Sequence, residues 1–169
     1  MLTVPPQLAP EFEALSKEID GLLEVHGSGR NALIPVLQDL RDRHHEISDL
    51  AMQVVADRLR VPAVEVQGVA TFYSYLGMEP TGQHVINLCR TLSCDMAGAK
   101  AVSKALTKEL GIKFGETTKD GQFTLRWANC IGMCDQAPAA LVGREALGSL
   151  APERVKEIIA GLKAKGDKK

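Results

Sequence analysis

The first eighty residues repeat apolar side chains at intervals of three and four, which is the period of an amphipathic helix. This spacing predicts helices over residues 10–26, 31–40, 48–59 and 62–76. Pro10 and Pro62 suit a first helical turn, and Ser48 suits an N-cap position. Four short helices joined by short loops predict a small helical bundle.

The pattern changes after residue 80. Short apolar or alternating runs predict strands over residues 84–88, 112–116, 123–127 and 138–142, and helical spacing predicts helices over 95–110 and 151–162. The order β-α-β-β-β-α predicts a layer of sheet covered by helices, and therefore an α/β fold after the bundle. The turn-forming residues 79–82 predict a linker, with one domain over residues 1–80 and a second over 81–169.

The composition, 45% hydrophobic and 24% charged in 169 residues, is typical of a globular protein. No apolar run is long enough to span a membrane, and the N-terminus lacks a secretory signal, so we expect a cytoplasmic protein. Residues 1–80 carry 12 acidic and 6 basic side chains, whereas residues 81–169 carry 9 and 14. This asymmetry predicts two parts with different surfaces. Scattered basic residues and few aromatic ones argue against nucleic-acid binding.

Residues 27–32 match the dinucleotide fingerprint G-x-G-x-x-A. That motif binds a nucleotide only where it follows a strand and opens a βαβ unit. Here it lies between two predicted helices, so it is interpreted as a helix–helix turn. The chain is not expected to bind NAD itself.

The four cysteines of the chain form two pairs, Cys89 with Cys94 and Cys130 with Cys134. Their spacings are C-x4-C and C-x3-C, and each pair follows a predicted strand. Both pairs are therefore expected on loops at strand ends, where functional sites are commonly built. In a reducing compartment, paired cysteines favour metal or redox chemistry over disulfides.

The spacing leaves two metal sites open. A redox dithiol needs C-x-x-C, which neither pair has. Structural zinc takes four thiolates, although a gap of two residues is more usual. A [2Fe–2S] cluster also takes four thiolates, and it gains from N–H groups directed at sulfur. Residues 91–93, 132 and 133 could supply such N–H groups, as could the N-terminus of a helix beginning near Asp95. The spacing favours iron–sulfur over zinc.

The segments CRTLSCDMAGA and ANCIGMCDQAP resemble the small iron–sulfur subunit of NADH dehydrogenases, the 24 kDa subunit family. The resemblance extends to GVATFY at residues 68–73 and to SLAPERVKEII near the C-terminus, and it covers about residues 30–160. It implies a thioredoxin-like [2Fe–2S] ferredoxin fold for residues 82–165, behind the helical bundle. It also implies one cluster bound by Cys89, Cys94, Cys130 and Cys134.

The resemblance further implies a role in electron transfer, without catalysis by this chain alone. The expected partner is a larger subunit that carries FMN, a site for NAD(P)H and a further cluster. The parent complex would be respiratory NADH:quinone oxidoreductase, a soluble NAD(P)-linked or electron-bifurcating hydrogenase, or a formate dehydrogenase. A location at the inner face of the membrane, within a complex, would fit as well as a free cytoplasmic one. The alternative function is a zinc-stapled adaptor without a redox role.

Other residues carry weaker expectations. His44 and His45 are expected in a solvated polar turn, and Trp127 in the core of the sheet. Phe72, Tyr73 and Tyr75 are expected to pack the bundle against a partner. Arg90 could raise the potential of a neighbouring cluster or could contact a partner carboxylate, and the sequence does not separate these roles.

Overall fold

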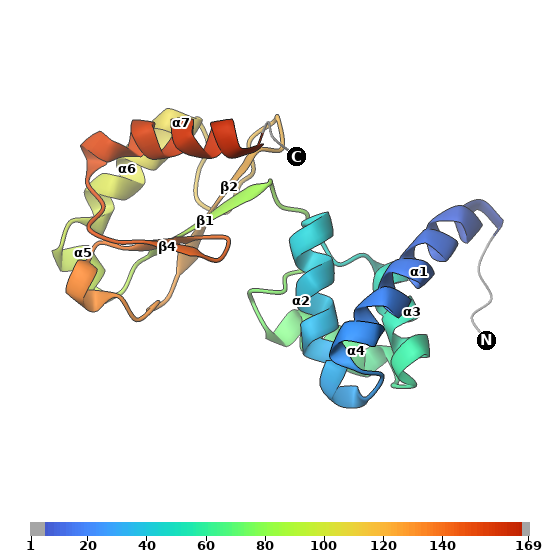
Figure 1. Cartoon of the computed structure of the whole chain (residues 1–169). Coiled ribbons are helices and arrows are strands. Elements are labelled where there is room, and N and C mark those ends of the chain that lie inside the picture. The colour runs from blue at the N-terminus through green and yellow to red at the C-terminus, as the bar shows by residue number, and fades with distance from the viewer. Residues whose placement is uncertain (1–5, 167–169) are drawn as a thin grey trace. The chain divides into compact units, whose positions relative to one another are not determined.

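The computed structural model of the chain describes residues 6–166, which divide into two units between Pro80 and Thr81 (Figure 1). The ends of the two predicted domain ranges, residues 1–5 and 167–169, lie outside the described residues. Each unit has its own apolar core and is described by itself. No helix within residues 6–166 combines the length and the apolar composition needed to cross a bilayer.

The first unit contains the four predicted helices (Figure 1). They are α1 (Ala9–His26), α2 (Leu33–His44), α3 (Asp49–Leu59) and α4 (Ala63–Phe72). The Ser48 hydroxyl accepts a hydrogen bond from the Ala51 N–H at 3.2 Å, which confirms its capping role. The fourth helix ends at Phe72 rather than at residue 76, because Tyr73 adopts an extended conformation.

The apolar stripes of the four helices face one another. Ile19, Val36, Leu37, Val54 and Val66 are fully buried, one or more from each helix. This burial stabilises the bundle, since each such side chain contributes about 1.5–3 kcal/mol when it leaves water. The predicted bundle is therefore confirmed.

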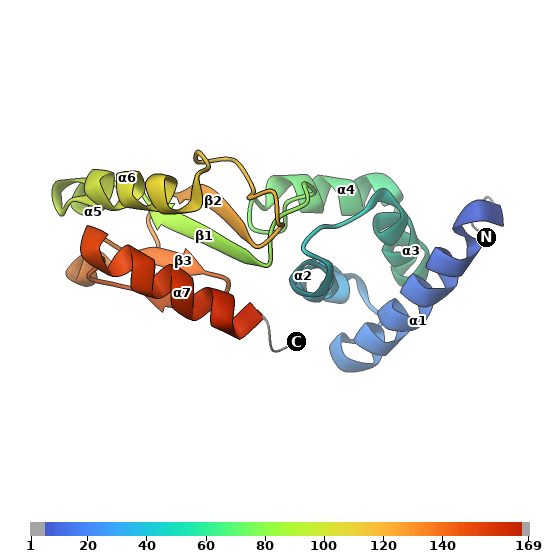
Figure 2. The same ribbon diagram turned by 90° about the horizontal axis from the view of Figure 1, so that it is seen from above.

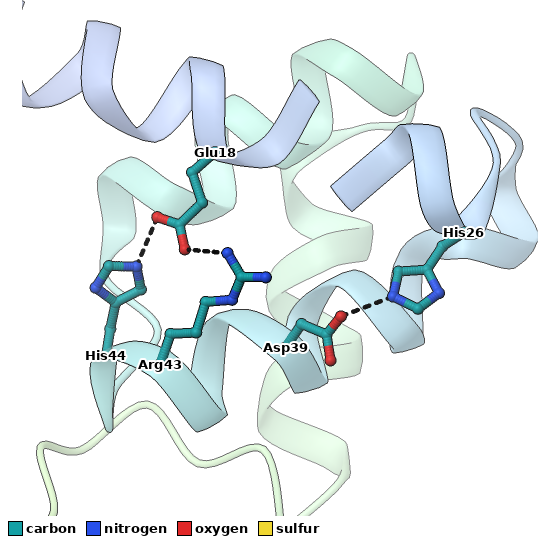
Figure 3. A network of polar contacts seen from close by, with 5 residues as sticks. All are labelled: Glu18, His26, Asp39, Arg43 and His44. Atoms are coloured by element: carbon teal, nitrogen blue, oxygen red, sulfur yellow. Dashed lines mark hydrogen bonds and ion pairs between the residues drawn. The ribbon is translucent and has the colours of Figure 1, made fainter. Parts of the chain in front are cut away.

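Polar contacts join α1 to α2 at the edge of this core (Figure 3). Glu18 binds Arg43 at 3.2 Å and His44 at 2.8 Å through its two carboxylate oxygens. His26 Nε2 lies 2.7 Å from the Asp39 carboxylate. His44 is exposed, as expected, but it lies in the last turn of α2 rather than in a loop turn, and its ring contacts Glu18 of α1.

The second unit is built on a four-stranded sheet (Figure 1). The strands are β1 (His84–Cys89), β2 (Phe123–Ala128), β3 (Ala140–Val142) and β4 (Glu145–Leu147). Their order is β2-β1-β3-β4, with β1 parallel to β2 and the other pairs antiparallel. The predicted sheet with helical cover is confirmed, although its strands are not all those expected.

Helices α6 (Ala99–Leu110) and α7 (Val155–Gly166) lie side by side over one face of the sheet (Figure 2). Alternate strand residues point at them, so Ile86 and Leu88 of β1 and Phe123 and Leu125 of β2 are buried. The helices contribute Val102, Leu106, Val155 and Ile159 to the same core.

One strand prediction was wrong, and one strand was missed. Residues 112–116 form no strand, because Gly115 has a φ of +97° and interrupts the extended run. The segment still runs beside β2, since an isolated bridge joins Thr117 to Thr124 and the Gly115 N–H donates to the Leu125 carbonyl at 2.7 Å. The short strand β4 was missed, since three residues next to a glycine turn carry too little pattern to predict a strand.

The predicted helix over residues 95–110 is two helices. A short α5 (Leu92–Met96) ends before Gly98, whose φ of +100° stops the first helix, and α6 follows. Cys94 consequently lies within a helix rather than ahead of one. Trp127 is 40% exposed and stacks on Phe114 with ring centroids 3.9 Å apart, so its expected place in the core was wrong.

Candidate metal centre

The parallel pairing of β1 and β2 brings both cysteine loops to one edge of the sheet. Cys89, the last residue of β1, is opposite Ala128, the last residue of β2. Parallel strands end at the same edge, so the loops that follow them emerge together. The Cys89 N–H donates to the Ala139 carbonyl at 3.0 Å, and the Arg90 N–H donates to that of Ala128 at 3.1 Å. These bonds hold the start of each loop.

The first cysteine pair is buried. Cys89 is 1% exposed and Cys94 is 2% exposed, and both pack against Ala99 at the start of α6. Ile131 and Ala137, from the second cysteine loop, pack on the same small cluster. The second loop therefore covers the first pair.

Hydrogen-bond donors converge on Cys89. Burial alone would raise the pKa of its thiol, but hydrogen bonds from the Thr91 hydroxyl and N–H, the Cys94 thiol and the Ile131 N–H outweigh burial and lower that pKa. The Thr91 hydroxyl oxygen lies 3.1 Å from the Cys89 sulfur. These hydrogen bonds therefore favour the thiolate form of Cys89.

Cys94 has the opposite tendency. Burial raises the pKa of its thiol, the neighbouring Cys89 and Cys134 raise it further, and an N–H bond from Ala139 offsets only part of the rise. Cys134 belongs to the second loop, whose Ile131 and Ala137 pack on the first pair. A positive ion between the pairs would remove this conflict, since it would stabilise both thiolates.

The second cysteine pair is exposed. The sulfur atoms of Cys130 and Cys134 lie 3.9 Å apart, and the Gly132 N–H points at the Cys130 sulfur from 3.4 Å. Two sulfurs that share one tetrahedral metal through 2.3 Å bonds would lie about 3.8 Å apart. Gly132 has a φ of +81°, which glycine adopts without strain. This loop is thus shaped to present two thiols to one ion.

A short neighbouring segment holds the second loop in place. The Ser149 N–H donates to the Gln136 carbonyl at 2.6 Å, and the Leu150 N–H donates to that of Pro138 at 2.9 Å. Gly148 leaves no room for a side chain, because a Cβ there would lie 2.7 Å from the Gln136 side chain. The peptide bond between Ala137 and Pro138 is cis.

The structure brings each cysteine near its sequence neighbour, and the loop that carries the second pair packs against the first pair. Of the N–H donors expected from the sequence, those of Thr91 and Gly132 face sulfur. The N–H groups of Ile131 and Ala139 were missed, and each reaches a cysteine of the other loop. Only knowledge of the strand pairing would have revealed them. Arg90 is exposed at the end of β1.

The four thiols are held as two pairs. Within residues 6–166, no three side chains of His, Cys, Asp and Glu form a group that could hold a single metal ion. The four thiols instead form two pairs, each able to supply two sulfurs. A [2Fe–2S] cluster takes four thiolates, two on each of its irons, so the donor set fits it.

Comparison with known proteins also points to a [2Fe–2S] protein. A family model described as "Thioredoxin-like [2Fe-2S] ferredoxin" matches residues 19–163. The chain is 36% identical over 156 residues to the E subunit of the NADH-quinone oxidoreductase of Escherichia coli K12, covering 92% of this chain and 94% of that protein.

A second kind of relative is a hydrogenase. The chain is 34% identical over 149 residues to the NAD-reducing hydrogenase HoxS subunit alpha of Cupriavidus necator, which is 88% of this chain but 25% of that protein. A solved NAD+-reducing [NiFe]-hydrogenase superimposes on 79% of this chain and 23% of its own, with a TM-score of 0.70 and 25% identity. The matched fold thus occurs both as a separate subunit and within a longer chain.

Proposed function

The chain belongs to the thioredoxin-like [2Fe–2S] ferredoxin family, and from that premise we propose that it is the electron-transfer subunit of an NAD(P)H-dependent oxidoreductase complex. Membership in this family implies a [2Fe–2S] cluster. The single observation that carries the proposal is the meeting of two cysteine pairs at one edge of the sheet, with donors directed at their sulfurs.

The proposed ligands are Cys89 and Cys94 for one iron and Cys130 and Cys134 for the other. Four thiolates are the donors that such a cluster requires, and a bound cluster supplies reversible one-electron transfer. The chain's own residues hold the sulfurs in position, exclude water from Cys89 and Cys94, and expose the other pair at the surface.

The exposure of Cys130 and Cys134 favours binding of a partner subunit at this edge of the sheet. Electrons reach a site efficiently only over short distances, so a donor must approach the exposed cysteines rather than the buried ones. We assign this partner role to a larger subunit with FMN and a site for NAD(P)H, because both kinds of relative are named as parts of NAD-linked enzymes. The chain would then be active in the cytoplasm or on the inner face of a membrane, within a hetero-oligomeric complex.

The two kinds of relative leave the parent complex open between an NADH-quinone oxidoreductase and an NAD-reducing hydrogenase. The chain corresponds to nearly all of the quinone oxidoreductase subunit and to a quarter of the hydrogenase subunit. If the protein carries an affinity tag and is purified from its source under mild conditions, the flavin subunit should copurify with it. Membrane subunits in the same fraction would support the quinone-linked complex, and a nickel–iron subunit would favour the hydrogenase.

The cluster is tested directly on the full chain. Protein purified or reconstituted without oxygen should contain about two irons and two acid-labile sulfides per chain and should absorb visible light. Serine at any of the four cysteine positions should lower the iron content, whereas Ser93→Ala, between the first pair, should not. Colourless protein with one zinc ion per chain would instead support the zinc-stapled adaptor.

A further inference from the structure

Thr91 occupies the N-cap position of α5 but does not cap the helix. Its backbone has the extended conformation of an N-cap, with φ −75° and ψ 164°, yet its side chain accepts no hydrogen bond from the first helical turn. Threonine at this position normally uses its hydroxyl to satisfy one of the free N–H groups there. The Thr91 hydroxyl is turned elsewhere and lies 3.1 Å from the Cys89 sulfur.

The direction of this hydrogen bond follows from the chemistry of the site. A cysteine that ligates iron is deprotonated, so its sulfur can only accept. The hydroxyl of Thr91 must therefore donate. Cys89 is almost fully buried, and the hydroxyl consequently meets little competition from water for the sulfur.

We propose that Thr91 is a positioning residue whose hydroxyl, by donating to the Cys89 sulfur, raises the reduction potential of the bound cluster. The proposal rests on the function proposed above. Reduction adds one electron and therefore negative charge to the cluster and its ligands. A hydrogen bond to sulfur stabilises the more negative form by a larger amount, which shifts the equilibrium towards reduction.

The neighbouring Ser93 provides a matched control. It lies between the same two cysteines and also carries a hydroxyl, but it is exposed on α5 and contacts neither sulfur in the hydrogen bonds found within residues 6–166. A hydroxyl in this loop should thus affect the potential only if it reaches a sulfur. Loss of an N-cap bond cannot explain an effect at Thr91, because no such bond is made.

The experiment compares four full-length chains, all reconstituted without oxygen: wild type, Thr91→Val, Thr91→Ser and Ser93→Ala. Each is titrated with dithionite, which supplies the electron, and the midpoint potential is measured by visible absorption and electron paramagnetic resonance. The Thr91 hydroxyl keeps its proton throughout. For Thr91→Val we expect about a tenfold change in the redox equilibrium towards the oxidised form, which is ~59 mV for one electron. Thr91→Ser and Ser93→Ala should match the wild type.

The proposal is overturned by an unchanged potential in Thr91→Val, or by an equal shift in Ser93→Ala. If Thr91→Val does not take up the cluster, Thr91→Ala repeats the test, and failure of both to bind iron would overturn tuning in favour of a role in holding the cluster. A wild-type chain without two irons and two sulfides would contradict the proposed function itself. These failures are therefore distinguishable before any potential is compared.

Discussion

Cys89 lies directly opposite Ala128 at the ends of the parallel strands β1 and β2. This pairing brings the loop after β2, which carries Cys130, beside Cys89, so that Ile131 of that loop packs against Cys89. Without this strand pairing, nothing in the fold would bring together two loops that are about forty residues apart in the sequence. The site is consequently a product of the sheet and not of either motif alone.

Burial predicts unequal reactivity of the four thiols. In full-length chain before cluster reconstitution, we expect iodoacetamide to modify Cys130 and Cys134 faster than Cys89 and Cys94, by about tenfold or more, because the reagent must reach the sulfur. Mass spectrometry of the peptides over time measures the rates. The unfolded chain is the control, and there all four should react at similar rates. Equal rates in the folded chain would contradict the burial of the first pair.

Arg90 should affect the cluster less than Thr91 does. Its side chain is exposed at the end of β1, and solvent screens an exposed charge much more than a buried hydrogen bond. Arg90→Gln should therefore lower the potential by less than Thr91→Val does, and Arg90→Lys, which keeps the charge, should lower it less still. If Arg90→Gln lowered the reduction potential as much as Thr91→Val does, the Arg90 guanidinium would influence the cluster at least as strongly as the Thr91 hydroxyl.

A methyl group at residue 148 should disturb the second cysteine loop. In Gly148→Ala the new Cβ would lie 2.7 Å from the Gln136 side chain and 3.1 Å from Met133, so the loop must shift. We expect a loss of about 1–3 kcal/mol in the free energy of unfolding and a lower iron content. Gly161→Ala on α7 is the control, where a Cβ meets nothing within 4 Å. That change should stabilise by up to about 1 kcal/mol.

The buried hydroxyl of Thr124 should stabilise the start of the second unit. It accepts a hydrogen bond from the Gly82 N–H at 2.7 Å and lies 2.8 Å from the Thr117 hydroxyl. Thr124→Val leaves a buried N–H without its acceptor and should cost about 1–3 kcal/mol. Urea unfolding followed by fluorescence of the single tryptophan, Trp127, measures the loss in this unit. Ser103→Ala, on the surface of α6, should change the stability by less than about 0.5 kcal/mol.

Ionised Asp120 should stabilise the folded chain, and acid should remove this contribution. The Thr118 hydroxyl and the Gln122 N–H hold the pKa of its carboxyl below the ordinary value of 3.8. The unfolded chain therefore binds this proton at a higher pH than the folded chain does. The contribution is complete above pH 3.8 and is lost as the pH falls through the folded pKa.

Asp120→Asn removes this dependence on pH. Acid unfolding followed by Trp127 fluorescence should show a shallower loss of stability below pH 3.8 in the variant than in the wild type. Superimposable acid transitions would show that the hydrogen bonds to Asp120 do not stabilise its ionised form.

Much of the fold could be predicted from local pattern. The four helices of the first unit follow from apolar residues at helical spacing, and Ser48 marks the start of one of them. Strands β1 and β2 follow from short apolar runs that end just before a cysteine. Residues 112–116 could not be assigned correctly, because an apolar run with a glycine fits a strand and a loop equally well. The end of the helix at Gly98 was missed because a glycine near a helix start is ambiguous without its φ angle.

The sequence by itself determined the chemistry of the site. Four cysteines in two tight pairs supply thiolates, and their gaps exclude a C-x-x-C dithiol whatever the fold. The tertiary structure decided which groups surround those thiolates, with one pair buried and the other exposed. It also decided that Ile131 and Ala139 donate across the two loops and that Thr91 turns its hydroxyl to sulfur instead of capping its helix. These features depend on contacts between segments distant in the chain, which no local pattern of residues encodes.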